Sequence, residues 1–149
     1  MISQAEYIDK LIDNFGLHDA KPLSIPMKSH WDLSPCPADL MAAELSLLAT
    51  FPYHQLIGSM MYAMTATHPD IAYAIGKLSC YLSTYTAYHF NAAKDVLCYL
   101  KGTQDLCIIY DGTKGTQLHN LVDSAFIDKD EERKSISGFL FTIAGGAVA

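Results

Sequence analysis

The spacing of the apolar residues changes at Gly102, and this change constrains the fold more than any other feature of the sequence. Before Gly102 the apolar residues recur every three or four positions, as on one face of a helix. After it they form short runs rich in β-branched and aromatic residues, separated by turn dipeptides such as Asp111-Gly112. A chain that is helical first and extended afterwards is predicted to be an α+β protein rather than a series of βαβ units.

The helical part carries several start and stop signals. Ser3 and Glu6 form an S-x-x-E capping box at the start of a first helix, and Gly16 is suited to follow its end. Pro69 suits the first position of a helix, and Gly102 is predicted to stop the last one. Beyond the first helix, the pattern predicts an extended segment over 17–27, helices over 38–48, 53–65, 69–83 and 89–101, and strands over 106–110, 117–126 and 135–143.

Composition excludes several classes of protein. Half of the residues are apolar and 17% are charged, so the chain is not intrinsically disordered. The chain has a net charge of −6, whereas domains that bind nucleic acid strongly on their own usually carry a surplus of basic residues. The uncharged stretch 45–69 contains Pro52 and Gly58 and is interpreted as a buried helix, not a membrane span. The N-terminus has no signal-peptide pattern, so we expect an intracellular protein, cytoplasmic or nuclear, without membrane attachment.

The cysteine and histidine residues predict no metal site. Cysteines occur at positions 36, 80, 98 and 107 without a C-x-x-C pair, and we interpret them as buried, reduced thiols. The six histidines are dispersed and form no H-E-x-x-H motif.

Ordered motifs run along most of the chain. They are Ile2-Ser3-Gln4, Phe15-Gly16-Leu17, Pro26-Met27, Tyr53-His54-Gln55-Leu56-Ile57-Gly58-Ser59-Met60-Met61-Tyr62, Pro69-Asp70-Ile71-Ala72-Tyr73-Ala74, Tyr99-Leu100-Lys101-Gly102-Thr103 and Arg133-Lys134-Ser135-Ile136-Ser137-Gly138-Phe139. In order and spacing they resemble the Pol polyprotein of copia-type LTR retrotransposons, from the end of the polymerase palm into the ribonuclease H (RNase H) domain. Only residues 28–50 match poorly.

This resemblance implies a domain organisation. Residues 1–104 would be a helical region like the thumb or connection of a reverse transcriptase. Residues 105–149 would be the first antiparallel strands of a truncated RNase H-like domain. The intact parent would copy RNA into DNA and, with Mg²⁺, cut the RNA strand of RNA–DNA hybrids. Its partners would be a template–primer or a hybrid.

The resemblance also implies one catalytic metal ligand, Asp123, which aligns with the first Asp of the family's opening RNase H strand. Ala125 and Phe126 stand where the family has its second Asp and a Trp. No Tyr-x-Asp-Asp string occurs, and we expect the polymerase carboxylates before Met1 and the later RNase H carboxylates beyond Ala149. A lone carboxylate cannot hold two metal ions, so Asp123 is interpreted as vestigial, with no cofactor bound by this chain alone. The alternative is a solvated carboxylate near a charged turn.

The expected nucleic-acid contacts are cationic. Lys94 and Lys101, with His89, recur on one side of a predicted helix, and Arg133, Lys134 and Ser135 form a basic turn suited to a phosphate backbone. The alternatives are solvent-facing charge and, for Arg133 and Lys134, the balancing of nearby acids. His68, Cys80, Asp95 and Cys98 stand where the family has cations, which predicts weakened phosphate affinity.

Three functions remain open at this point. The first is a Pol fragment without catalysis of its own. The second is a binding module that associates with full-length Pol or with nucleic acid, because the strand at 135–143 would expose an unpaired edge. The third is an RNase H-type nuclease whose missing carboxylates come from a partner.

Overall fold

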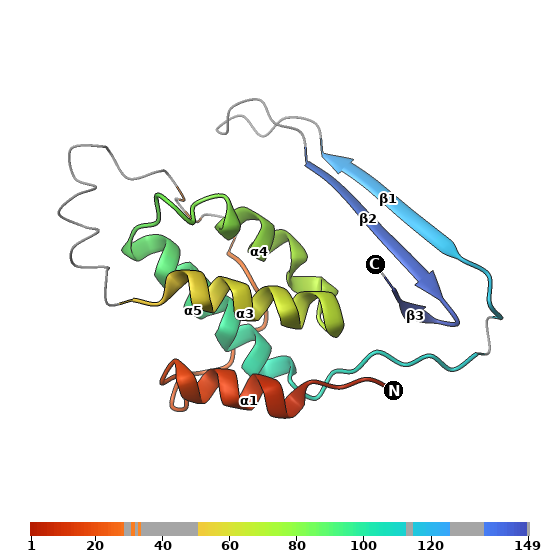
Figure 1. The fold of residues 1–149 in the computed structure, drawn as a ribbon, viewed down its shortest axis with the longest axis horizontal. Coiled ribbons are helices and arrows are strands. Elements are labelled where there is room, and N and C mark those ends of the chain that lie inside the picture. Colours follow the sequence, from red (N-terminus) through yellow and green to blue (C-terminus); the bar gives the residue numbers. More distant parts are fainter. Residues whose placement is uncertain (29–30, 32, 34–50, 113–114, 126–135, 149) are drawn as a thin grey trace. The chain divides into compact units, whose positions relative to one another are not determined.

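The computed structural model describes residues 1–28, 31, 33, 51–112, 115–125 and 136–148. The chain divides into a helical unit, Ser3–Leu106, and a β unit that joins Met1–Ile2 to Cys107–Ala149 (Figure 1). Helices precede an antiparallel sheet, so the predicted α+β class is confirmed. The interpretation of the two parts as a connection-like region and an RNase H-like domain stays a prediction.

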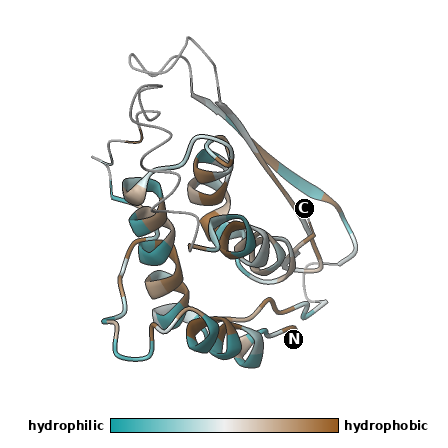
Figure 2. Ribbon diagram, turned by 60° about the vertical axis from the view of Figure 1, so that its left-hand side comes forward, coloured by the Kyte–Doolittle hydropathy of each residue, from teal (hydrophilic) through white to brown (hydrophobic). Residues whose placement is uncertain are grey.

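The helical unit is built around one apolar core. Its elements are α1 (Ala5–Asn14), α3 (Tyr53–Ala66), the 3₁₀ turn η1 (Pro69–Ile71), α4 (Ala72–Ser79) and α5 (Ala87–Thr103). Each helix carries both hydrophobic and hydrophilic residues, as Figure 2 shows by colour. The apolar stripes meet in a core that includes Ile8, Leu11, Ile12, Leu56, Ile57, Met60, Ile75, Leu78, Val96, Leu97 and Leu100. Burial of these stripes is the main stabilising term of the unit.

Two tyrosine hydroxyls form hydrogen bonds between helices of this unit. Tyr7 of α1 donates to the carbonyl of Ser59 on α3 at 3.0 Å. Tyr53, which is fully buried, donates to the carbonyl of Leu78 on α4 at 2.9 Å. Burial raises the pKa of the Tyr53 hydroxyl, so this donor keeps its proton well into the alkaline range.

The capping box predicted at Ser3 and Glu6 is wrong. Helix α1 begins at Ala5 with Gln4 as its N-cap and without a side-chain cap, and the Ser3 hydroxyl reaches only the N–H of Ala5, at 3.3 Å. The helix therefore starts too late for Ser3 to bond the N–H of Glu6. Its end is as predicted, since Gly16 follows with a φ of +64°, a conformation that favours glycine.

Other predicted boundaries shift where tertiary contacts intervene. The helix predicted over 69–83 is divided into η1 and α4 and ends at Ser79. The segment 17–27 contains turns and bends rather than a strand. It passes so close to α5 that a Cβ on Gly102 would lie 3.1 Å from Cβ of Pro22, so Gly102 permits this approach instead of ending the helix. The helix predicted over 38–48 lies outside the described residues.

The β unit is a three-stranded antiparallel sheet in the order β1 (His119–Ala125), β2 (Ile136–Ile143), β3 (Gly146–Ala147). Two predicted strands, 117–126 and 135–143, correspond to β1 and β2. The third, 106–110, forms only an isolated bridge between Ile108 and Ile2. Ala144 and Gly145 join β2 to β3 with φ of +51° and +88°, as a tight hairpin turn requires.

In the described part of the chain, no helix is long and apolar enough to cross a membrane. Cys80, Cys98 and Cys107 are free thiols. Burial was predicted for all of them but holds only for Cys98, because Cys80 is exposed and Cys107 is half-buried. Cys36 lies outside the described residues.

Candidate nucleic-acid interface and metal ligand

Helix α5 positions two of the predicted phosphate-binding cations. Its first turn is fixed by a capping box in which Thr86 is the N-cap and His89 the N3 residue. The backbone N–H of Thr86 donates to Nδ1 of His89 at 3.0 Å, so the other ring nitrogen of His89 carries the proton. His89 is fully buried, so its side chain cannot contact nucleic acid in this structure.

Lys94 lies over the ring of Phe90, with its Nζ 4.6 Å from the ring centroid. Among the described residues its ammonium group forms no ion pair, so its charge is left for an external anion. The neighbouring Asp95, which would repel a phosphate, is paired with Lys28 at 3.0 Å. Lys28 therefore compensates the acid beside Lys94, a contact that the sequence does not reveal because the two residues are far apart along the chain.

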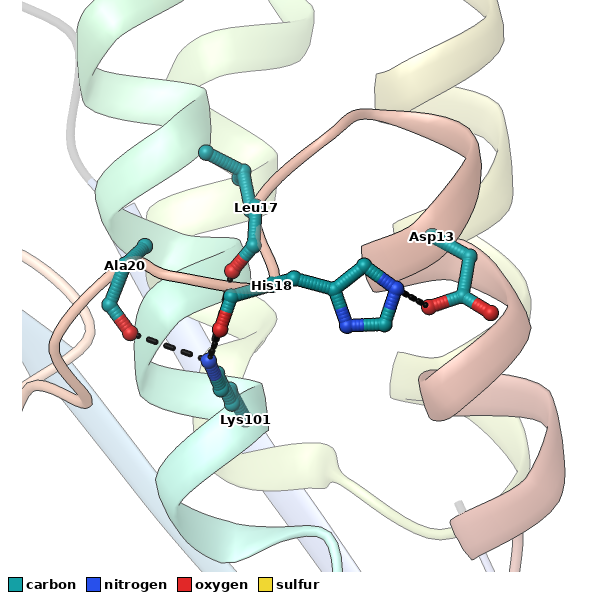
Figure 3. Close-up of polar contacts among 5 residues, drawn as sticks. All are labelled: Asp13, Leu17, His18, Ala20 and Lys101. Atoms are coloured by element: carbon teal, nitrogen blue, oxygen red, sulfur yellow. Dashed lines mark hydrogen bonds and ion pairs between the residues drawn. The ribbon is translucent and has the colours of Figure 1, made fainter.

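Lys101 is engaged with the protein itself. Its Nζ donates to the carbonyls of Leu17 at 3.3 Å, Ala20 at 3.0 Å and His18, in the loop that follows α1 (Figure 3). An ammonium group has three donors, and all of them have acceptors here. A phosphate would have to compete with these carbonyls. Nucleic-acid contact by Lys101 stays a prediction, whereas its hydrogen bonds to the loop after α1 are present in the structure.

Asp123, the predicted metal ligand, lies on β1 opposite Gly138 of β2 and is exposed. Because opposite residues of an antiparallel pair point to the same face, Leu121 and Leu140 are among its neighbours on that face, and they offer no ligand oxygen. Asp123 is the one acidic residue in β1, β2 and β3. In the described residues no three side chains of the metal-binding types gather. The described part of the sheet therefore offers a single carboxylate, which does not by itself fit a pair of Mg²⁺ ions.

The remaining predicted contacts, Arg133, Lys134 and Ser135, lie outside the described residues and stay predictions. They belong to the connection between β1 and β2, whose strands end at Ala125 and begin at Ile136.

One polar pair on α5 was not predicted. The hydroxyl of Tyr99 donates to the carboxylate of Asp70 on η1. This hydrogen bond, with burial and the charge of Asp70, raises the pKa of Tyr99 to about 12. Both residues stand in motifs of the family resemblance, but those motifs are 29 positions apart and only the tertiary fold brings the two side chains together.

The Tyr99–Asp70 pair is expected to make stability fall at alkaline pH. The folded protein holds the Tyr99 proton up to about pH 12, whereas an unfolded tyrosine loses it from about pH 10. Between about pH 10 and pH 12 the unfolded state therefore binds fewer protons than the folded state, and the free energy of unfolding falls as the pH rises. After allowance for the partial exposure of Tyr99, we expect a fall of about 1 kcal/mol. Urea unfolding at pH 9 and pH 11.5 should show a smaller decline for Tyr99→Phe than for the wild type. Tyr88→Phe, at an exposed site, is the control and should behave as the wild type.

Known proteins place this chain in a family. It is 36% identical over 148 residues to the retrovirus-related Pol polyprotein from transposon TNT 1-94 of Nicotiana tabacum, a match over 99% of this chain and 11% of that protein. It is 30% identical over 139 residues to the Pol polyprotein from transposon RE2 of Arabidopsis thaliana, over 93% of this chain and 9% of that protein. The chain thus spans about a tenth of the length of these polyproteins.

A shorter relative is the secreted RxLR effector protein 161 of Plasmopara viticola, which is 37% identical over 98 residues, 66% of this chain and 69% of that protein. No protein-family model matches the chain, and no solved structure matches it. The relatives show that the chain belongs to the copia-type retrotransposon Pol family, as its motifs predicted.

Proposed function

We propose that this chain is the part of a retrotransposon Pol protein that joins the polymerase palm to the RNase H domain, and that it is not catalytic by itself. The helical unit would contact the template–primer through Lys94, and the β unit would supply the opening strands of an RNase H-like fold. Arg133, Lys134 and Ser135 would hold the phosphate backbone of an RNA–DNA hybrid. Family membership and the observed order of helices before antiparallel strands support this proposal.

The position of Asp123 is the observation that carries the non-catalytic part of the proposal. Cleavage of RNA by two metal ions needs several carboxylates that converge on both ions. The described sheet offers one, which lies opposite a glycine and next to the pair Leu121–Leu140. Asp123 can therefore contribute a single ligand, and the parent protein's Mg²⁺ chemistry would need acids from elsewhere.

A cleavage assay tests this proposal. The purified chain is incubated with a labelled RNA–DNA hybrid in the presence of Mg²⁺ or Mn²⁺. We expect no more product than with the Asp123→Asn variant, because the missing ligands cannot be replaced by one carboxylate. Turnover by the wild type that Asp123→Asn abolishes would overturn the proposal. Turnover that appears only when a Pol protein is added, and that depends on Asp123 of this chain, would instead support a nuclease completed by a partner.

A second candidate function is a binding module that associates with Pol or with nucleic acid. The effector protein of Plasmopara viticola supports this candidate. That protein is much shorter than the Pol polyproteins, and the segment related to this chain makes up 69% of it. Co-purification of this chain with a Pol protein would support the second function.

A further inference from the structure

Residues 17–28, which we call the strap, form no helix or strand and lie along α5. Three carbonyls at the start of the strap accept hydrogen bonds from Lys101, in the last turn of α5 (Figure 3). Farther along, the N–H of Leu23 donates to the carbonyl of Cys98 at 3.2 Å, and Lys28 pairs with Asp95 at 3.0 Å. The strap therefore follows α5 from its end toward its start.

Polar contacts hold the strap more than apolar burial does. Its side chains are half-buried or exposed, and only Leu17 and Met27 pack against the core. The bond from Leu23 is its one backbone hydrogen bond to α5 among the described residues. A segment with little buried apolar surface and few backbone hydrogen bonds opens at a lower free energy than a core helix.

The strap is anchored at both of its ends. Helix α1 precedes it and buries Ile8, Leu11 and Ile12 in the core. Beyond the other end, Leu33 is buried, and its carbonyl lies 3.3 Å from Nε2 of His89 on α5. Opening of the strap therefore does not require that α1 or Leu33 leave the core.

One face of α5 lies beneath the strap. Asp95, Cys98 and Gly102 are spaced i, i+3 and i+7, so they share one side of the helix. Asp95 pairs with Lys28, and a Cβ on Gly102 would lie 3.1 Å from Cβ of Pro22. Cys98 lies between these two contacts and is only 9% exposed. The Cys98 thiol is therefore covered by the strap.

We propose that the strap opens from α5 as one unit while the helices stay folded, and that the hydrogen bonds of Lys101 are the main contacts that keep it closed. Opening breaks these bonds, the bond from Leu23 and the ion pair of Lys28, and it exposes the Cys98 thiol. This inference is independent of the proposed function, because it depends only on the contacts between the strap and α5.

Lys101 contributes more than Lys28 to the closed form. Hydrogen bonds to a charged donor are stronger than neutral ones, and the ammonium group of Lys101 forms three of them within four residues of the strap. The Lys28–Asp95 pair is largely exposed on the lysine side, so solvent and salt weaken it. Loss of Lys101 should therefore open the strap more often than loss of Lys28.

The rate at which Cys98 reacts with iodoacetamide tests the proposal. Peptide mapping by mass spectrometry separates Cys98 from Cys80, which is exposed and gives the rate for an accessible thiol. We expect Cys98 to react at least about tenfold more slowly than Cys80. Low concentrations of urea should change the Cys98 rate little, because opening of the strap exposes much less surface than global unfolding.

Two lysine replacements on α5 separate the hydrogen bonds from the charge. Burial and the charge of Asp95 raise the pKa of the Cys98 thiol, whereas the ammonium groups of Lys101 and Lys94 lower it. Both replacements by methionine therefore reduce the thiolate fraction, and only Lys101→Met frees the strap. We expect Lys101→Met to speed the reaction of Cys98 at least about tenfold, and Lys94→Met to leave it unchanged or slower by about twofold.

A replacement in the strap itself gives a second test. Lys28→Met removes the ion pair with Asp95 and should speed the reaction of Cys98 about threefold. Because salt screens an exposed pair, about 1 M NaCl should speed the wild-type reaction to a similar extent and leave the rate of Lys28→Met unchanged. Iodoacetamide is uncharged, so salt does not alter its encounter with the thiol.

Three outcomes would overturn the proposal. Cys98 could react as fast as Cys80 in the wild type, which would mean that the strap does not cover it. Its reaction could follow the steep urea dependence of global unfolding at every urea concentration. Lys101→Met and Lys94→Met could change the rate equally. Circular dichroism checks that the variants are folded, and if Lys101→Met is not, the urea dependence of the wild type and the rate of Lys28→Met decide.

Discussion

Replacing His89 with alanine should lower the free energy of unfolding of the helical unit by about 3 kcal/mol. The ring of His89 is fully buried and closes the capping box of α5 by accepting from the N–H of Thr86. Its Nε2 lies 3.3 Å from the carbonyl of Leu33, and its ring centroid lies 4.3 Å from that of Tyr81. Alanine removes the cap, leaves a buried carbonyl without its donor and opens a cavity beside Tyr81.

A second variant separates these contributions. His89→Gln can still accept from the N–H of Thr86, since glutamine is a common N3 residue of capping boxes. It loses the contact with Tyr81, so we expect a cost of about half that of alanine. The measurement is urea unfolding followed by the fluorescence of Trp31, the single tryptophan, which packs against the core of the helical unit. A loss below about 1 kcal/mol for His89→Ala would contradict the structural role assigned to this side chain.

Lys101→Met should also destabilise the helical unit, by about 2 kcal/mol. The substitution keeps most of the apolar stem but removes the ammonium group that bonds the carbonyls of Leu17, His18 and Ala20. Hydrogen bonds to charged groups contribute more than neutral ones, and the part-buried carbonyls of Leu17 and Ala20 would lose their donor. The loop after α1 would then exchange its amide hydrogens faster than in the wild type.

Lys94→Met is the matched control for Lys101→Met, because it removes the same charge from the same helix. Its ammonium group lies over Phe90 and bonds no carbonyl of the described residues, so the expected loss of stability is below about 1 kcal/mol. In binding to a template–primer, the order should reverse, with Lys94→Met giving the larger loss of affinity and a smaller salt dependence. Equal loss of stability for the two variants would contradict the conclusion that the hydrogen bonds of Lys101 stabilise the loop after α1.

Much of the fold followed from local patterns. The stripe of Ile8, Leu11 and Ile12 predicted a helix with a buried face, and the structure confirms it. The runs around Leu121 and Phe139 predicted strands that the structure contains as β1 and β2. These predictions succeeded because helical and extended periodicity are properties of neighbouring residues.

Predictions about single side chains were less successful for a physical reason. Ser3 and Glu6 matched a capping box, but the box that forms uses Thr86 and His89, which has no standard signature. His89 was predicted on a cationic helix face and is buried in the core. Whether a polar side chain caps, packs or faces solvent depends on where the helix begins and what lies against it, and distant segments supply both.

The sequence by itself determined the order of helices before strands, the apolar stripes that form the core, and membership in the copia-type Pol family. Each of these depends on residue types and their spacing along the chain. Only the tertiary structure decided that Lys101 is held by carbonyls of the loop after α1, that Lys28 neutralises Asp95, and that Asp123 faces a glycine. Those contacts join residues that are far apart in the chain, and their distances are set by the packing of the core and the register of the sheet.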